Sequence, residues 1–376
     1  IEDELKEIQK LIGELEALLK SRAKIMKVVK TELMEVADKY GDDRRTKIVK
    51  GGVKQLNPED LVPDDESVLV LTKGGYVKRT NPSEYKVQKR GGVGVIDLNT
   101  KEEDVVTTLL TTSAHSDLLF FTDAGKVYQS KMYEIPEGRR ATKGKSIMNF
   151  LPLTAEEHVT SVLAVRKDEW DGDWGLMMVT KNGVAKKSDA SAFKDVRRSG
   201  LIAIKLKPDD ALIAARFVGS GDEVSLVTRK GQSIRFKEED VREMGRTAAG
   251  VAAMKIAKGD RIVSADVLSK GVRDREVLVV TENGYGKATP AKEYKVQKRA
   301  GSGIKTVKVT SKTGEVVAGI IISEEERKEG ELVIMSKKGQ VIKLPLKQVP
   351  TLGRDTQGVK VMKMRPGDQI ASVVFV

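Results

Sequence analysis

The sequence predicts an all-β fold of six propeller-like blades, preceded by one long amino-terminal helix. The first observation is a seven-residue phrase that occurs twice without a change, at residues 84–90 and 293–299. The second is a set of six similar turns whose glycines are separated by 48 to 58 residues. A period of about 50 residues with several short strands is typical of propeller blades, because helical repeats have periods of about 33 to 47 residues.

Each repeat opens with a predicted β-hairpin, in which a β-rich run is followed by a turn glycine and a second run. Pairs such as Asn182-Gly183 and Asn283-Gly284 supply the positive φ angles that tight hairpin turns need. The six turn glycines are Gly75, Gly125, Gly183, Gly231, Gly284 and Gly339. Most repeats then end in the pattern Arg-x-x-x-Gly, whose glycines are Gly94, Gly144, Gly250, Gly303 and Gly358; the third repeat ends instead at Gly200.

Residues 1–40 predict one long helix that forms half of a coiled coil. Apolar residues follow the alternating 3-4 spacing of a coiled-coil seam, interrupted by Arg22 at one core position, and Gly13 is the weak point of the helix. No second heptad run occurs in the sequence, so we expect the chain to be a fragment of a longer protein. Residues 41–66 contain glycine, proline and acidic residues without a period and predict a linker, and residues 67–376 hold the six repeats.

The composition excludes several classes of protein. There is no cysteine, so disulfides and metal-thiolate sites are impossible, and nothing contradicts a reducing cytoplasm. No apolar stretch reaches the roughly 20 residues of a membrane span, and the amino terminus lacks the apolar core of a signal peptide. The net charge is +12; residues 1–40 carry −1, so the excess of positive charge belongs to the rest of the chain.

The positive charge recurs at two places in the repeats. Three or four residues after the turn glycine stand Lys78, Arg79, Lys186, Lys187, Arg235, Lys287 and Lys343. Near the end of the repeat stand Lys89, Arg90, Arg139, Arg140, Lys143, Lys145, Arg197, Arg198, Arg246, Lys298, Arg299 and Arg354. Because equivalent positions of a propeller lie at equal radius, these residues predict a basic belt around the disc.

Exposed basic residues also protect sheet edges, and a single Lys pair favours that interpretation. Recurrence in most repeats favours a surface for a curved polyanion, because Lys and Arg neutralise the phosphates of duplex DNA. A protein-binding propeller would need aromatic and apolar anchors, and single-strand binding would need stacking platforms, whereas only 4% of the chain is aromatic. The two histidines, His115 and His158, lie far apart in the sequence and do not predict a metal or acid-base site.

The segment Gln88-Lys89-Arg90-Gly91-Gly92-Val93-Gly94 resembles the box that marks the carboxy-terminal domain of the A subunit of bacterial DNA gyrase. Six of its seven places fit, and Val93 stands where that family usually has Lys or Arg. A weaker version stands at residues 297–303. Residues 1–40 and 41–46 resemble the last helix of the breakage-reunion core and the stretch that follows it, so the resemblance covers nearly the whole chain.

The resemblance implies a six-bladed β-pinwheel whose blades exchange strands and whose outer edge bends duplex DNA. Of the box, it implies DNA-binding roles for Gln88, Lys89, Arg90, Gly91, Gly92 and Gly94, although the glycines taken alone are turn formers. It implies the gyrase B subunit and a second copy of the A subunit as partners, two of each, with ATP and Mg²⁺ bound elsewhere in that assembly, in the bacterial cytoplasm at the nucleoid. No tyrosine here follows an Arg as that family's DNA-cleaving tyrosine does, so this fragment is expected to be non-catalytic and to bind no cofactor of its own.

The related A subunit of topoisomerase IV, which mainly separates linked duplexes, is the alternative within the resemblance. Its disc has fewer or degraded boxes. The nearly complete first box of this chain favours gyrase and the introduction of negative supercoils in an ATP-driven cycle.

Overall fold

The structure is a computed structural model of the chain, and it divides into two units, Ile1–Asn57 and Pro58–Val376. Each unit is described by itself below. The residues that the structure describes are 1–42, 46, 58–85, 104, 106–139, 142–272 and 274–375.

The first unit contains two consecutive helices, α1 (Glu2–Leu19) and α2 (Arg22–Tyr40), where the sequence predicts one. The interruption falls at Ser21, whose φ of −126° and ψ of 109° are extended, and not at Gly13, which lies inside α1. Serine is a preferred residue at the position before the first turn of a helix. Arg22, which follows it, interrupts the apolar seam at the same point. Neither helix buries a residue, and among the described residues no helix has the length and apolar character needed to cross a membrane.

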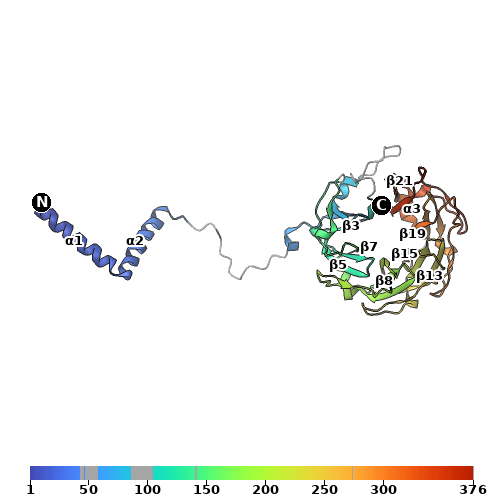
Figure 1. Ribbon diagram of the computed structural model, residues 1–376, viewed down its shortest axis with the longest axis horizontal. Coiled ribbons are helices and arrows are strands. Elements are labelled where there is room, and N and C mark those ends of the chain that lie inside the picture. Colours follow the sequence, from blue (N-terminus) through green and yellow to red (C-terminus); the bar gives the residue numbers. More distant parts are fainter. Residues whose placement is uncertain are drawn as a thin grey trace. The chain divides into compact units, whose positions relative to one another are not determined.

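The second unit is a ring of six antiparallel sheets, one for each repeat (Figure 1). From the inside outward, the first blade consists of β3 (Val106–Ser113), β1 (Glu66–Thr72), β2 (Tyr76–Thr80) and β6 (Lys145–Ser146). The second consists of β7 (Val159–Val165), β4 (Asp117–Thr122), β5 (Lys126–Lys131) and β10 (Leu201–Ile202). The third consists of β11 (Leu212–Val218), β8 (Gly175–Thr180), β9 (Val184–Asp189) and β14 (Val251–Ala252).

The remaining blades follow the same order. The fourth consists of β15 (Ile262–Leu268), β12 (Glu223–Thr228), β13 (Gln232–Lys237) and β18 (Ile304–Lys305). The fifth consists of β19 (Val316–Ile322), β16 (Glu276–Thr281), β17 (Tyr285–Pro290) and β22 (Val359–Lys360). Within the described residues, the sixth consists of β23 (Ile370–Phe375), β20 (Glu331–Ser336) and β21 (Val341–Pro345).

Short helical segments complete the repeats. A 3-10 turn follows the second strand of each hairpin: η2 (Pro82–Tyr85), η3 (Met132–Glu134), η6 (Ala190–Phe193), η7 (Glu238–Asp240), η8 (Ala291–Glu293) and η9 (Leu346–Gln348). Three further 3-10 turns and one short helix lie in other connections: η1 (Pro58–Leu61), η4 (Ile147–Asn149), η5 (Glu169–Asp171) and α3 (Glu324–Glu329).

Each of the first five blades receives its outermost strand from the next repeat. β6, for example, belongs to the second repeat but pairs with β2 of the first, with Val77 opposite Lys145. β10, β14, β18 and β22 pair in the same way with β5, β9, β13 and β17. The predicted exchange of strands between blades is therefore confirmed, and it carries the ends of the second to sixth repeats to the outer edge of the ring.

The predicted hairpin turns are confirmed as well. All six turn glycines have positive φ angles, between 74° and 83°. At Gly75 the backbone N–H donates to the carbonyl oxygen of Thr72 at 3.0 Å, which closes the turn. Other residues reach this backbone conformation only at a steric cost, so glycine allows the two strands to turn back on each other.

The hydrophobic core lies between neighbouring blades in six clusters. Five of them join consecutive blades along the chain. The sixth joins the last blade to the first through Met335 and Val374 on one side and Val68 and Val70 on the other. The hydroxyl of Ser372 also donates to the carbonyl oxygen of Val106 at 2.8 Å. The six sheets therefore close into a ring. The sequence alone could not distinguish a flat disc from a spiral.

Part of the predicted linker packs against the ring. Lys131 of the second repeat lies 2.8 Å from the carboxylate of Glu59, and the Nε2 atom of His115 lies 2.8 Å from the carbonyl oxygen of Val62. Residues 58–65 thus belong to the second unit.

Candidate nucleic-acid interface

Within the described residues, five loops carry repeat-ending cations and lead directly into the outermost strands. We call them the basic loops: residues 139 and 142–144, 197–200, 246–250, 298–303 and 354–358. The glycine that ends each one has a positive φ angle, between 73° and 86°. A Cβ atom at Gly144, Gly250 or Gly358 would lie 2.5 to 2.7 Å from a backbone oxygen of the strand beneath. These glycines therefore have a structural role that sets the loop against its blade.

Of the eight described cations of the basic loops, four are exposed. The exposed cations are Arg139, Arg197, Arg198 and Lys298, and Lys145 on the adjoining β6 is exposed as well. Lys298 lies 3.1 Å from the carboxylate of Asp240, but 90% of its side chain remains accessible. At the outer edge these charges can approach an extended anion without rearrangement of the fold.

The other cations of the basic loops are half-buried. The ammonium of Lys143 lies over the ring of Tyr76, 3.5 Å from its centroid. Arg299 donates from Nε to the carbonyl oxygen of Asp240 and from a terminal nitrogen to that of Ala252, both at 2.9 Å. Arg246 and Arg354 are also half-buried, and Arg354 donates to the carbonyl oxygen of Lys305 at 3.3 Å. These contacts fix the loops while leaving part of each charge at the surface.

The predicted cations four residues after the turn glycine each face a carboxylate. Arg79 lies 4.0 Å from Glu137, and Lys187 lies 2.5 Å from Glu238. Arg235 pairs with Glu223, and Lys343 pairs with Glu331. Because each charge has an opposite charge beside it, these four residues add little to the net potential of the rim.

The cations three residues after the turn glycine, Lys78, Lys186 and Lys287, correct the predicted belt. Their side chains are at most 1% exposed and donate hydrogen bonds to backbone carbonyl oxygens. Burial lowers the pKa of Lys186 and of Lys287 to about 8, because desolvation disfavours the charged ammonium. A buried ammonium cannot reach a phosphate at the surface, so we remove these three lysines from the predicted contact set. Alternation along a strand explains the error, since neighbouring residues point to opposite faces.

A row of exposed lysines that was not predicted from the sequence lies at the same edge, and we call its members the rim lysines: Lys205, Lys255, Lys308 and Lys363. Each stands five residues after the repeat-ending glycine, and this spacing is the signal that could have found them. The backbone N–H of Lys205 donates to Ala248, that of Lys255 to Gly301 and that of Lys308 to Thr356, at 2.9 to 3.2 Å. These acceptors lie in the basic loop of the next repeat, so each of these lysines joins the cations of that loop.

The remaining predicted residues, Gln88, Lys89, Arg90, Gly91, Gly92, Gly94 and Arg140, lie outside the described residues. Their assignment to DNA stays a prediction.

The model of one protein family matches all six repeats. Its description is "DNA gyrase C-terminal domain, beta-propeller", and it matches residues 66–113, 116–166, 176–218, 222–269, 275–323 and 330–376. The chain belongs to the DNA gyrase C-terminal domain family.

Relatives and solved structures agree with this family. The A subunit of DNA gyrase from Staphylococcus epidermidis is 40% identical over 376 residues, and that from Staphylococcus aureus is 41% identical over 374 residues. Each match covers all of this chain but 41% of the relative, so the chain spans about two fifths of the length of these relatives.

Two solved structures share the fold. A DNA gyrase A C-terminal domain superposes with a TM-score of 0.67 at 28% identity, over 82% of this chain and 99% of that one. The C-terminal domain of a DNA topoisomerase IV superposes with a TM-score of 0.68 at 24% identity, over 84% of this chain and 94% of that one.

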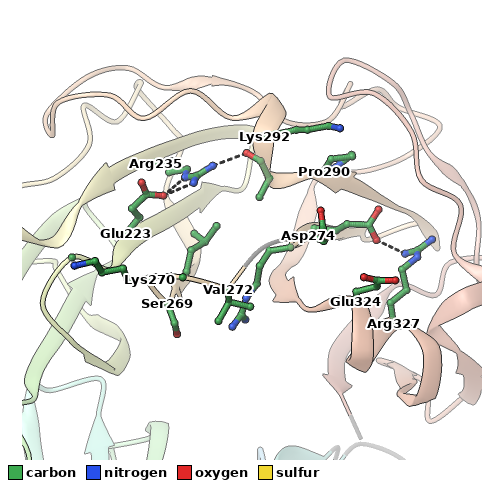
Figure 2. Close-up of a pocket in the computed structure, with 16 residues that line it drawn as sticks. Glu223, Arg235, Ser269, Lys270, Val272, Asp274, Pro290, Lys292, Glu324 and Arg327 are labelled. Atoms are coloured by element: carbon green, nitrogen blue, oxygen red, sulfur yellow. Dashed lines mark hydrogen bonds and ion pairs between the residues drawn. The ribbon is translucent and has the colours of Figure 1, made fainter.

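In this gyrase C-terminal domain a cavity of about 650 Å³ lies away from the rim lysines, among the connections of the fourth, fifth and sixth blades (Figure 2). Arg235 on its wall points toward Glu223, and Arg327 lies 2.8 Å from Glu276. Arg235 is the one predicted DNA-binding residue among those that line it. Carboxylates alternate with cations in its lining, which also holds Asp274, Arg275 and Lys292 and contains none of the rim lysines.

Proposed function

We propose that this gyrase C-terminal domain binds duplex DNA along its outer edge and bends it around the ring. The observation that supports this most is the alternation of rim lysines and basic loops at the outermost strands of successive blades. Recurrence at equal radius spaces the cations along an arc, and family membership supports a shared role for that arc.

The energetics favour an arc over a single patch. Bending 20–30 bp by 40–90° costs on the order of 1–6 kcal/mol. Lys and Arg offset this cost by neutralising phosphates and releasing condensed counterions. A duplex contacts all the cations of a curved path only if it bends to follow that path, so binding and bending are coupled. Recognition would then depend on the backbone and on deformability rather than on base sequence.

We further propose that the chain is part of the A subunit of DNA gyrase and serves the ATP-dependent introduction of negative supercoils. In this proposal the gyrase B subunit and a second copy of the A subunit are its partners, and ATP and Mg²⁺ act on other parts of the assembly. The names of the relatives and the nearly complete first box favour gyrase over topoisomerase IV. The topoisomerase IV domain is less than 25% identical, so its likeness supports the fold alone.

The proposal predicts that the chain binds linear duplex DNA with a steep salt dependence and traps writhe in closed circles. With about 6 to 10 phosphate contacts, a plot of log affinity against log salt should have a slope of about −5 to −9. Gel mobility over a range of ionic strength measures the slope, and relaxation with a nicking-closing enzyme measures the writhe. Tight binding with no trapped writhe at low salt would favour a basic patch without bending, and no DNA binding would favour a protein-binding scaffold.

The box predicts a larger effect on wrapping than on binding. Replacing Lys89 and Arg90 together with Ala should reduce the trapped writhe more than the affinity for a short linear duplex. The reason is that, in the family that the segment resembles, the box loop helps to close the wrap between the first and last blades. The matched control is the double Ala variant of Lys298 and Arg299 in the second, weaker copy. Equal losses of writhe and affinity in the Lys89 and Arg90 variant would remove the special role of the first box.

A further inference from the structure

Among the described residues of the ring, three lysines are buried, although the proposed DNA surface does not use them. Lys78, Lys186 and Lys287 occupy the third place after the turn glycine in the first, third and fifth repeats, and they are at most 1% exposed. The other three repeats carry Tyr128, Ile234 and Ile342 at the equivalent place. The fold therefore accepts an apolar or aromatic side chain where these repeats place a charge.

Two of these lysines bind the same part of a basic loop. The Nζ atom of Lys287 donates to the carbonyl oxygens of Gly353 and Arg354, both at 2.5 Å, and to the hydroxyl of Thr356 at 3.0 Å. The Nζ atom of Lys78 donates to the carbonyl oxygens of Arg139 and Thr142 at 3.2 and 3.1 Å. Gly353 and Arg139 each lie five residues before the repeat-ending glycine, so the contact is repeated in the second and sixth repeats.

Lys186 makes a related contact and extends it to a second segment. Its Nζ atom donates to the carbonyl oxygen of Arg246 in the basic loop of the fourth repeat. It also donates, at 2.5 Å, to the carbonyl oxygen of Ala203, which directly follows β10 on the neighbouring blade. One ammonium thus holds the loop that bears Arg246 against the segment that leads to Lys205.

The acceptors explain why a charge is present here. An ammonium has three donors, and several carbonyl oxygens of one loop can converge on it, which no apolar side chain provides. Burial of a charge carries a cost, and packing does not require it, because Ile234 fills the equivalent place under Gly301. The benefit therefore lies in the order that the ammonium imposes on the loop.

We infer that Lys186 and Lys287, with Lys78, are positioning residues for DNA bending: each orders the basic loop of the next repeat so that its arginine lies along the rim. The inference rests on the proposed function, since it gives a role in bending to residues that touch no DNA. Arg246 and Arg354 are the surface cations whose backbone the two lysines hold directly.

The inference predicts a dependence of bending on pH. Lys186 and Lys287 lose their protons near pH 8, and the loop carbonyls then lose their charged donor. The charged group that faces Lys186 is Arg246. The charged groups that face Lys287 are Glu293, Asp355 and Arg354. The stability of the fold depends on pH in the opposite direction to bending. Between pH 8 and 10.5 the unfolded chain binds more protons at these two lysines than the folded chain does, so their contribution to the free energy of unfolding rises with pH. Deprotonation of these two lysines therefore does not itself favour unfolding, and circular dichroism over the same pH range distinguishes loss of bending from unfolding.

The test replaces Lys186 and Lys287, singly and together, with the isoleucine that the fourth repeat carries naturally. For the double variant we expect the trapped writhe at pH 7.5 to fall at least about twofold. We expect the slope of log affinity against log salt on a short linear duplex to change by less than about one, because no surface cation is removed. The wild-type chain should lose writhe between pH 7.5 and 9, and the double variant should not. The matched control is Ile234→Val, which leaves every ammonium in place and should keep the wild-type pH profile.

The possible results distinguish failure of this inference from failure of the proposed function. Equal writhe in the double variant and the wild type at pH 7.5, or the same pH profile in both, overturns the inference. A wild-type chain that binds DNA without trapping writhe overturns the proposed function instead. If the double variant does not fold, the pH profile of the wild type decides: a fall through pH 8 with an unchanged circular dichroism spectrum supports the inference, and a flat profile overturns it.

Discussion

Replacing all four rim lysines with Ala is expected to lower the affinity for duplex DNA about 10³-fold at 0.1 M salt. Each of Lys205, Lys255, Lys308 and Lys363 is exposed beside the outer edge of a blade. If each neutralises one phosphate, their loss reduces the slope of log affinity against log salt by about 3.6. Surface substitutions of this kind usually change the free energy of unfolding by at most about 0.5 kcal/mol, so the fold is expected to persist.

Two controls distinguish the effect of the position of the rim lysines from the effect of the net charge of the chain. The quadruple Lys→Arg variant keeps four cations at the rim and should retain the wild-type slope. A second variant with the same loss of charge replaces Lys6, Lys10, Lys24 and Lys27 of α1 and α2, all exposed, with Ala. A slope that falls equally in both Ala variants would show that net charge, and not the rim, governs binding.

The fold could be predicted from the sequence because its signals are local and repeated. Glycines at the turns report a backbone conformation that few other residues adopt, and their period fixes the number of blades. The break in the amino-terminal helix region was not predicted. Gly13 is the weaker helix former, but the extended conformation of Ser21 and the position of Arg22 in the seam decide where the helix ends.

The site could be predicted only in part, because contacts between repeats decide which cations are exposed. Lys186 and Lys187 are neighbours in the sequence, yet one is buried under the loop of the next repeat and the other pairs with Glu238. Both Arg246 and Glu238 lie in the following repeat, so composition and spacing could not separate the two roles. The rim lysines were missed for a different reason: a single Lys between apolar residues has no local signal, and only alignment on the repeat-ending glycines reveals the row.

Replacing Gly284 with Ala is expected to destabilise the ring by about 2–5 kcal/mol, the sum of the cost of the backbone conformation and of the steric overlap. Its φ angle is 83°, a conformation that costs an L-residue about 1–2 kcal/mol. In addition, a Cβ atom would overlap the carbonyl oxygen of Met362 in the next repeat. The carbonyl oxygen of Gly284 accepts hydrogen bonds from the backbone of Val361 at 2.9 Å and of Met362 at 3.2 Å. Movement to relieve the overlap would therefore weaken the segment that carries β22 onto the fifth blade.

Urea denaturation followed by circular dichroism measures this effect, and Gly271→Ala is its matched control. Gly271 has nearly the same φ angle, 81°, but no heavy atom lies within 4 Å of the place that its Cβ would occupy. The control therefore isolates the backbone term of about 1–2 kcal/mol, and the difference between the two variants measures the close approach of adjacent repeats. Equal destabilisation would show that the turn conformation alone, and not contact with the exchanged strand, makes glycine necessary at this place. A larger loss at Gly284 would mean that the turn which opens one repeat also holds the end of the next, so that loosening it would disturb the rim at β22.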